Sequence, residues 1–120
     1  MEYTSSVFEA THTGPFADEM HGHLWNVRIY WPALPIQDAR WMNVRLESVL
    51  NRWDHHVLDG LVEPTNYGIA KAISDEMPDV VRVDVWREGR VPCGAIYEKG
   101  SRLERASSNG SDQENDGGVR

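Results

Sequence analysis

The chain has 120 residues, a formal net charge of −7 and a single cysteine, Cys93. This length suits one domain. The negative charge argues against nonspecific binding of nucleic acid or of an anionic membrane. A single cysteine excludes a disulfide framework. Because no apolar run approaches the roughly 18 residues of a membrane span and no secretory signal is visible at the start, we expect a soluble, cytoplasmic protein.

The first two predicted elements are strands, over residues 2–12 and 22–33. The second run alternates in polarity from Leu24 to Trp31, which is typical of a β-strand. Pro32 ends it, because proline cannot donate a hydrogen bond to a β-ladder. The connection between the two runs is rich in turn formers, so we expect them to pair as an antiparallel hairpin.

Two helices are predicted next. Residues 38–53 form the first, with Asp38 as its N-cap. Its expected apolar face repeats at helical spacing and consists of Trp41, Val44, Leu46, Val49, Leu50 and Trp53. A loop over 54–60 follows. Thr65 then caps a second helix that ends at Pro78. The expected apolar face of this helix consists of Ile69, Ala70, Ala72 and Ile73.

Two further strands, over 79–87 and 91–98, complete the order ββααββ. Val81, Val83 and Val85 alternate with polar residues, which indicates a half-buried strand. This order predicts an α+β domain over residues 1–99, with a four-stranded antiparallel sheet and both helices on one face. A core of this size is modest, and oligomerisation is a common remedy. The tail over 100–120 is almost devoid of apolar residues, so we expect it to be disordered.

Three histidines form a candidate metal site. His21 and His23 are two residues apart on a predicted strand, so their side chains share one face. His12 ends the preceding strand and would lie beside them in an antiparallel hairpin. Three neutral imidazoles with an open fourth position are typical of catalytic zinc. The alternative is that these histidines are polar residues on the solvent-exposed face of a sheet.

Asp54 and His55 form a candidate proton-transfer pair in the loop after the first helix. A carboxylate that accepts a hydrogen bond from one imidazole nitrogen fixes the tautomer and raises the basicity of the other nitrogen. Such a pair can act as a general acid or base. The alternative is a helix C-terminus carrying histidines that interact favourably with the helix dipole.

Four segments resemble, in order, those of the 6-pyruvoyl-tetrahydropterin synthase and 6-carboxytetrahydropterin synthase family. They are Phe-Glu-Ala-Thr-His at 8–12, Met-His-Gly-His at 20–23, Trp-Asp-His-His-Val-Leu at 53–58 and Glu-Pro-Thr at 63–65. The segment Cys-Gly-Ala-Ile-Tyr at 93–97 is similar to the last strand of the carboxy enzyme. The resemblance covers residues 7 to about 98.

The resemblance implies a tunnelling fold (T-fold), in which ββααββ subunits form barrels as trimers or hexamers with sites at subunit interfaces. It implies zinc bound by His12, His21 and His23, and 7,8-dihydroneopterin triphosphate as substrate. Zinc would polarise the hydroxylated side chain of the substrate. Asp54 and His55 correspond to the family's proton relay.

The chain departs from the family at the catalytic base. The family has a cysteine four residues before His-Gly-His, where this chain has Ala17. A related subgroup has glutamate three residues before the motif, where this chain has Asp18, followed by Glu19. Either carboxylate could serve as the base if burial raised its pKa. The alternative for both is a solvated loop end. We expect the lone Cys93 to be a small buried residue rather than a substitute base.

The pterin-binding end also departs from the family. The family's third strand ends in a glutamate that binds the pterin. Counting two residues on from Val85, as the family pattern Val-x-Val-x-Glu requires, places Arg87 at this position. A one-residue bulge would bring Glu88 into this position, and we predict that it does. Thr65, in the family's Pro-Thr segment, is the second predicted substrate-binding residue, whereas Tyr67 replaces a family glutamate. Candidates for holding the triphosphate are Arg28, Arg45 and Lys71.

The sequence leaves three functions open. The first is 6-carboxytetrahydropterin synthesis for a 7-deazapurine (queuosine-type) pathway, favoured by overall likeness. The second is cleavage of the same substrate to 6-hydroxymethyl-dihydropterin for folate synthesis, favoured by Ala17 and Asp18. The third is a metal- or pterin-binding relative without catalysis, favoured by Ala17, Arg87 and Tyr67.

Overall fold

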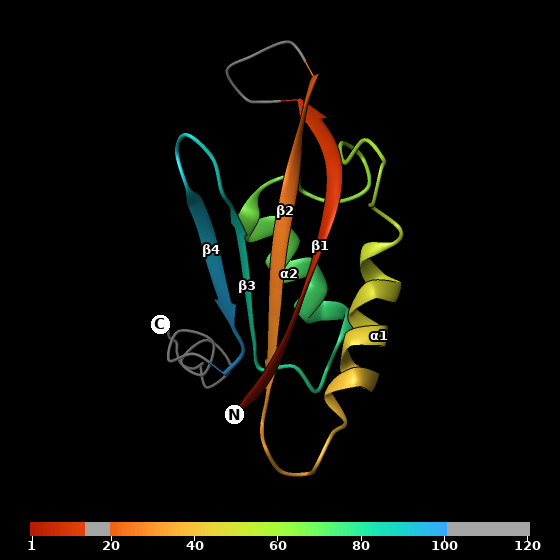
Figure 1. Ribbon diagram of the computed structural model, residues 1–120, viewed down its shortest axis with the longest axis vertical. Helices are drawn as coiled ribbons and strands as arrows, with labels where there is room; N and C mark the ends of the chain where they lie inside the picture. Colours follow the sequence, from red (N-terminus) through yellow and green to blue (C-terminus); the bar gives the residue numbers. More distant parts are fainter. Residues whose placement is uncertain (14–19, 101–120) are drawn as a thin grey trace, which may run out of the picture.

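The computed structural model describes residues 1–13 and 20–100. Its elements are, in chain order, β1 (Glu2–Thr13), β2 (Met20–Trp31), α1 (Ala39–Leu50), α2 (Asn66–Glu76), β3 (Arg82–Arg87) and β4 (Cys93–Glu98). The strands form one antiparallel sheet in the order β1-β2-β3-β4. Both helices lie on one side of it, with α1 against β1 and α2 against β3 and β4 (Figure 1). The predicted α+β class and the ββααββ order are confirmed.

The predicted bounds shift by a few residues. β3 begins at Arg82 rather than at 79, because the chain after α2 first forms a turn that places Val80 in the core. α1 ends at Leu50 rather than at 53, because residues 51–55 continue as turns. Apart from its first residue, Gly100, the predicted disordered tail over 100–120 lies outside the described residues.

The core lies between the sheet and the two helices. The central strand β2 supplies Trp25, Val27, Ile29 and Trp31, all buried and two residues apart. This spacing places them on one face of the strand. Phe8 of β1 stacks on Trp25 with ring centroids 6.0 Å apart. The alternation of β2 therefore fixes which face of the sheet the helices cover.

The predicted apolar face of α1 is wrong at two positions. Trp41 is 59% exposed and Val44 is 52% exposed. The buried residues are Met42, Leu46 and Leu50, which are four apart and form one stripe along the helix. Trp41 and Val44 flank that stripe on the solvent side.

Both predicted helix caps are confirmed. The Asp38 side chain accepts a hydrogen bond from the Arg40 N–H at 2.8 Å. Thr65 Oγ1 accepts from the Gly68 N–H at 2.9 Å. Gly68 packs so closely that a Cβ there would lie 2.5 Å from the Glu63 carbonyl oxygen. The start of α2 is thus fixed by a cap and by a residue without a side chain.

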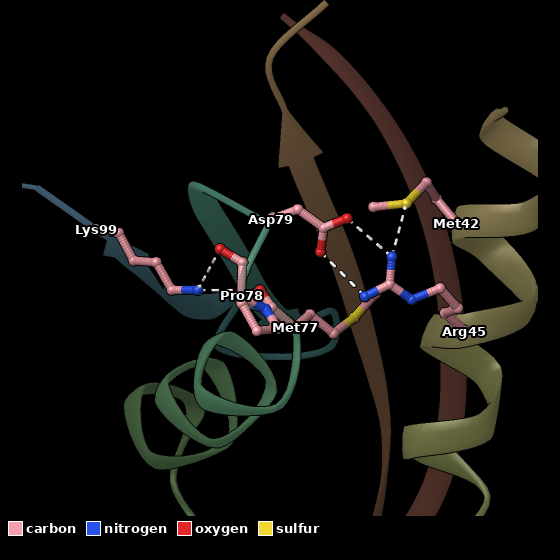
Figure 2. A network of polar contacts seen from close by, with 6 residues as sticks. All are labelled: Met42, Arg45, Met77, Pro78, Asp79 and Lys99. Atoms are coloured by element: carbon pink, nitrogen blue, oxygen red, sulfur yellow. Dashed lines mark hydrogen bonds and ion pairs between the residues drawn. The ribbon is translucent and has the colours of Figure 1, made fainter. Parts of the chain in front are cut away.

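An ion pair joins α1 to the turn before β3 (Figure 2). Arg45 donates from two nitrogens to the Asp79 carboxylate, at 2.9 and 3.0 Å. Asp79 thereby holds the pKa of Arg45 above its usual value, and Arg45 holds that of Asp79 below. Lys99 donates to the Met77 carbonyl in the same turn at 3.0 Å. Arg45, a predicted triphosphate contact, is therefore already engaged within the fold.

Within the part of the chain that the structure describes, no helix is both long and apolar enough to cross a membrane.

Candidate functional site

His12 and His23 lie together on the helix-covered face of the β1–β2 hairpin. Antiparallel pairing sets His12 opposite His21, and Ala10 opposite His23. The ring centroids of His12 and His23 are 5.0 Å apart, and His12 is only 6% exposed. The predicted convergence of these two imidazoles is therefore present. The side chain of His21 lies outside the described part of the structure.

The spacing of this pair fits a zinc ion. Two imidazoles on one tetrahedral zinc, with Zn–N near 2.1 Å, place their ring centroids roughly 5 Å apart. The His12–His23 separation of 5.0 Å agrees with this value. Among the described side chains, which do not include His21, no group of three or more His, Cys, Asp or Glu could hold a metal ion. Two ligands thus fit, and the trio stays a prediction.

A buried tryptophan holds both imidazoles in place. The Trp25 ring meets His12 and His23 edge-on, with centroids 5.5 and 5.8 Å apart. The Arg87 guanidinium lies 4.8 Å from the Trp25 ring centroid. Because Trp25 itself is fully buried, these contacts leave the two histidine rings little freedom to reorient.

The loop after α1 is hydrogen-bonded along the edge of β1 that faces away from β2. The Thr11 N–H donates to the His56 carbonyl at 3.1 Å, and the Leu58 N–H donates to the Thr11 carbonyl at 2.8 Å. Val57 forms a parallel bridge with Thr11. The Thr13 N–H donates to Asp59 at 3.1 Å. The predicted loop therefore has a fixed course beside β1.

Asp54 and His55 are in contact, as expected from the sequence. Asp54 Oδ2 lies 3.0 Å from His55 Nδ1, and Asp54 Oδ1 accepts from the Glu9 N–H at 2.9 Å. The Glu9 amide first, and then the His55 ring, hold the pKa of Asp54 below its usual value. Asp54 is thus ionised at neutral pH and can orient the imidazole.

The Asp54–His55 pair and the histidine pair lie on opposite sides of β1 in one chain. His55 contacts the side chain of Glu9, which is three residues before His12. Side chains three apart on a strand point to opposite faces, and His12 points to the helix-covered face. A hollow of about 310 Å³ opens beside this edge of β1; it is lined by Glu9, Ala10, Thr11, Gly22, His55, His56 and Val57.

The predicted bulge at the end of β3 is absent. β3 and β4 pair in regular register as far as Arg87, which lies opposite Cys93. Arg87 follows Val85 on the helix-covered face, whereas Glu88 accepts a hydrogen bond from the Trp86 indole at 3.0 Å. Trp86 belongs to the other face of the sheet. The position predicted for Glu88 is therefore occupied by Arg87.

Cys93 is exposed, which corrects the expectation of a buried thiol. β4 is an edge strand, so its first residue is covered on one side only. The Asn66 and Arg87 side chains each approach the Cys93 sulfur to 3.4 Å. Asn66 first, and also Arg87, lower the pKa of the thiol. The sequence analysis missed this cluster, because its members come from three different elements.

The other predicted site residues are placed as follows. Thr65 Oγ1 donates to Glu63 at 3.0 Å in addition to capping α2, so its hydroxyl is already bonded within the fold. Asp18 and Glu19, the two predicted bases, lie outside the described residues. Glu9 was missed as a site residue, and no local pattern marks it because its partner comes from a distant loop.

No family model matches the chain, and no curated protein matches it.

Proposed function

We propose that the protein is a zinc-dependent lyase that acts on 7,8-dihydroneopterin triphosphate, with 6-carboxytetrahydropterin as its product. In this proposal His12, His21 and His23 bind the zinc ion. The observation that supports it most directly is the 5.0 Å separation of the His12 and His23 rings. The site then belongs to a small-molecule enzyme that supplies a 7-deazapurine pathway.

The residues of the chain would divide the chemistry between binding and proton transfer. When bound, zinc supplies a Lewis acid that polarises the hydroxylated side chain of the substrate. Trp25 keeps the His12 and His23 rings oriented. Asp54 accepts from Nδ1–H of His55, which fixes the ring and directs Nε2 outward. His55 Nε2 is then the atom that exchanges protons with the substrate.

We further propose that each complete site is shared between two subunits of a trimer or hexamer with T-fold barrels. Within one chain, His55 and the histidine pair lie on opposite sides of β1. His55 is also 72% exposed at the edge of the sheet, so it is available to a neighbouring chain. In the assembly, His55 of one subunit serves the zinc site of the next.

A second candidate function is that of a metal- or pterin-binding relative without catalysis. The observation that favours it is Arg87 on the helix-covered face at the end of β3. A guanidinium only donates hydrogen bonds, so it cannot accept from the pterin amino group as a carboxylate does.

The folate-type cleavage to 6-hydroxymethyl-dihydropterin depends on Asp18. Its product distinguishes this reaction from 6-carboxytetrahydropterin synthesis.

Metal binding gives the first test. Purified protein is loaded with zinc and dialysed, and bound zinc per chain is measured by elemental analysis. We expect about one zinc per chain, and a loss of most of it in His12→Ala and His23→Ala, since three ligands define the site. His56→Ala is the matched control and should keep its zinc. The His56 imidazole is not a proposed zinc ligand, because its Nδ1 donates to the Asp54 carbonyl in the loop after α1. Zinc retained by both ligand variants would contradict the assignment.

Turnover gives the second test. Zinc-loaded protein is incubated with 7,8-dihydroneopterin triphosphate, and the product is identified by mass spectrometry. We expect 6-carboxytetrahydropterin, with activity lowered roughly 10²- to 10⁴-fold by Asp54→Asn, because general acid–base catalysis contributes about this much. Comparing Asp18→Ala with Glu19→Ala assigns the base. Bound zinc without any turnover would favour the second candidate function.

A further inference from the structure

His55 contacts a second carboxylate in addition to Asp54. Glu9 Oε1 lies 3.3 Å from His55 Nε2, whereas Asp54 Oδ2 lies 3.0 Å from Nδ1. The imidazole is therefore held at both nitrogens, with one carboxylate from β1 and one from the loop after α1. An imidazole nitrogen donates only when it bears hydrogen. The two carboxylates therefore face the two ring nitrogens through which an imidazole exchanges protons.

The main chain of Glu9 adds two contacts to the same pair. Its N–H donates to Asp54 Oδ1 at 2.9 Å, and its carbonyl accepts from the His55 N–H. His55 has φ of 60°, and no other residue except glycine has a positive φ in the described structure. This conformation is uncommon outside glycine and costs free energy, so surrounding contacts must hold it. Glu9 provides one of those contacts.

The position of the Glu9 side chain is set by the sheet. Glu9 lies within β1, opposite Leu24 of β2, so its backbone is fixed on both sides. Its side chain is 64% exposed and that of His55 is 72% exposed. An exposed ion pair contributes little to stability. The contact is therefore better explained by what it does to the orientation of the His55 ring beside the hollow that Glu9 and His55 both line.

We propose that Glu9 is a positioning residue for the proton-transfer step, an inference that rests on the proposed function. Asp54 and Glu9 hold the two nitrogens of His55 and thereby fix the plane of its ring. Substrate replaces Glu9 at Nε2, and that nitrogen exchanges a proton with the substrate while Nδ1–H stays hydrogen-bonded to Asp54. Exchange with the bulk solvent restores the starting protonation of the ring before the next turnover. Glu9 itself forms no bond with the substrate.

The test compares Glu9→Ala with Glu9→Gln, whose amide oxygen can still accept from Nε2–H. For Glu9→Ala we expect kcat to fall roughly tenfold with KM unchanged, a fraction of the 10²–10⁴ that general acid–base catalysis contributes. Glu9→Gln is expected to recover most of this loss. Glu2→Ala is the matched control, because Glu2 is exposed at the other end of the same strand.

A second measurement does not depend on turnover. Relaxation of the His55 ring Cε1–H, measured by NMR, reports how firmly the imidazole is held. We expect a more mobile ring in Glu9→Ala and an ordered ring in wild type, Glu9→Gln and Glu2→Ala, with zinc content unchanged in all. Unchanged ring mobility in Glu9→Ala would overturn the proposal. Ordered rings and bound zinc in a wild type without turnover would instead count against the proposed function alone.

Discussion

Cys93 illustrates, at the scale of a single residue, how neighbours from other elements set the chemistry of a side chain. The thiol begins β4, its Asn66 partner begins α2, and its Arg87 partner ends β3. Both partners stabilise the negatively charged thiolate more than the neutral thiol. The pKa of Cys93 is lowered for this reason, mainly by Asn66.

We predict that Cys93 is alkylated by iodoacetamide at lower pH than an ordinary cysteine. A thiolate forms as the pH rises through the pKa, so a lowered pKa shifts the rate profile toward acid. Asn66→Ala and Arg87→Gln should slow the reaction at pH 7 by a factor on the order of two to ten. Arg90→Gln, in the same hairpin, serves as control. Identical profiles in all variants would contradict this explanation.

At this scale the sequence predicts contacts within one hairpin better than contacts between elements. The approach of His12 and His23 follows from alternation and antiparallel pairing, which are visible in the sequence. The contacts of His55 with Glu9, and of Cys93 with Asn66, depend on where a loop and a helix lie relative to the sheet. No periodic pattern in the sequence predicts that position.

Among the elements, α1 shows how small the difference is between a buried and an exposed helix position. Leu46 is fully buried and lies on the stripe that packs toward the sheet, whereas Val44, two residues earlier, faces solvent. Successive helix positions are rotated by about 100°, so two residues place a side chain on the opposite side. Hydrophobicity alone did not distinguish the two positions.

We predict that Leu46→Ala lowers the free energy of unfolding by about 2–5 kcal/mol, because it removes buried methyl groups and leaves a cavity. Val44→Ala on the same helix should change it by no more than about 0.5 kcal/mol, as is usual for surface positions. Urea unfolding followed by circular dichroism measures both. Similar losses for the two variants would mean that the burial pattern of α1 is wrong.

The order and type of the six elements could be predicted because each has a clear period and, for the helices, a capping residue. Asp38 and Thr65 mark the two helix starts correctly. The ends were less predictable: α1 stops at Leu50, although Trp53 continues its apolar spacing and is itself buried. A buried residue just beyond a helix extends the periodic pattern without extending the helix.

For the molecule as a whole, one face of the sheet is left uncovered by helices. Val7, Leu24 and Ile96 lie on it and are largely exposed in the single chain. Subunit association is a common way for a small domain to bury additional apolar surface. The proposed trimer or hexamer is consistent with this exposed surface and with the position of His55 at the edge.

We predict a mass of three or six times the 13.7 kDa chain by light scattering.

We also predict that inactive His23→Ala and His55→Ala proteins regain activity when their subunits are exchanged. In a mixed oligomer, some sites receive an intact zinc ligand set from one chain and an intact His55 from the other. A monomer, or mixtures that stay inactive after proven exchange, would contradict the shared site.

The course of residues 54–59 along β1 also bears on how this protein avoids unwanted association. The outward N–H groups of Glu9, Thr11 and Thr13 and the carbonyls of Glu9 and Thr11 are hydrogen-bonded to that segment, so they are not available to pair with a foreign strand. Unpaired strand edges promote aggregation. Shortening the segment would leave these main-chain groups unpaired, and we expect the protein to form fibrils more readily as a result.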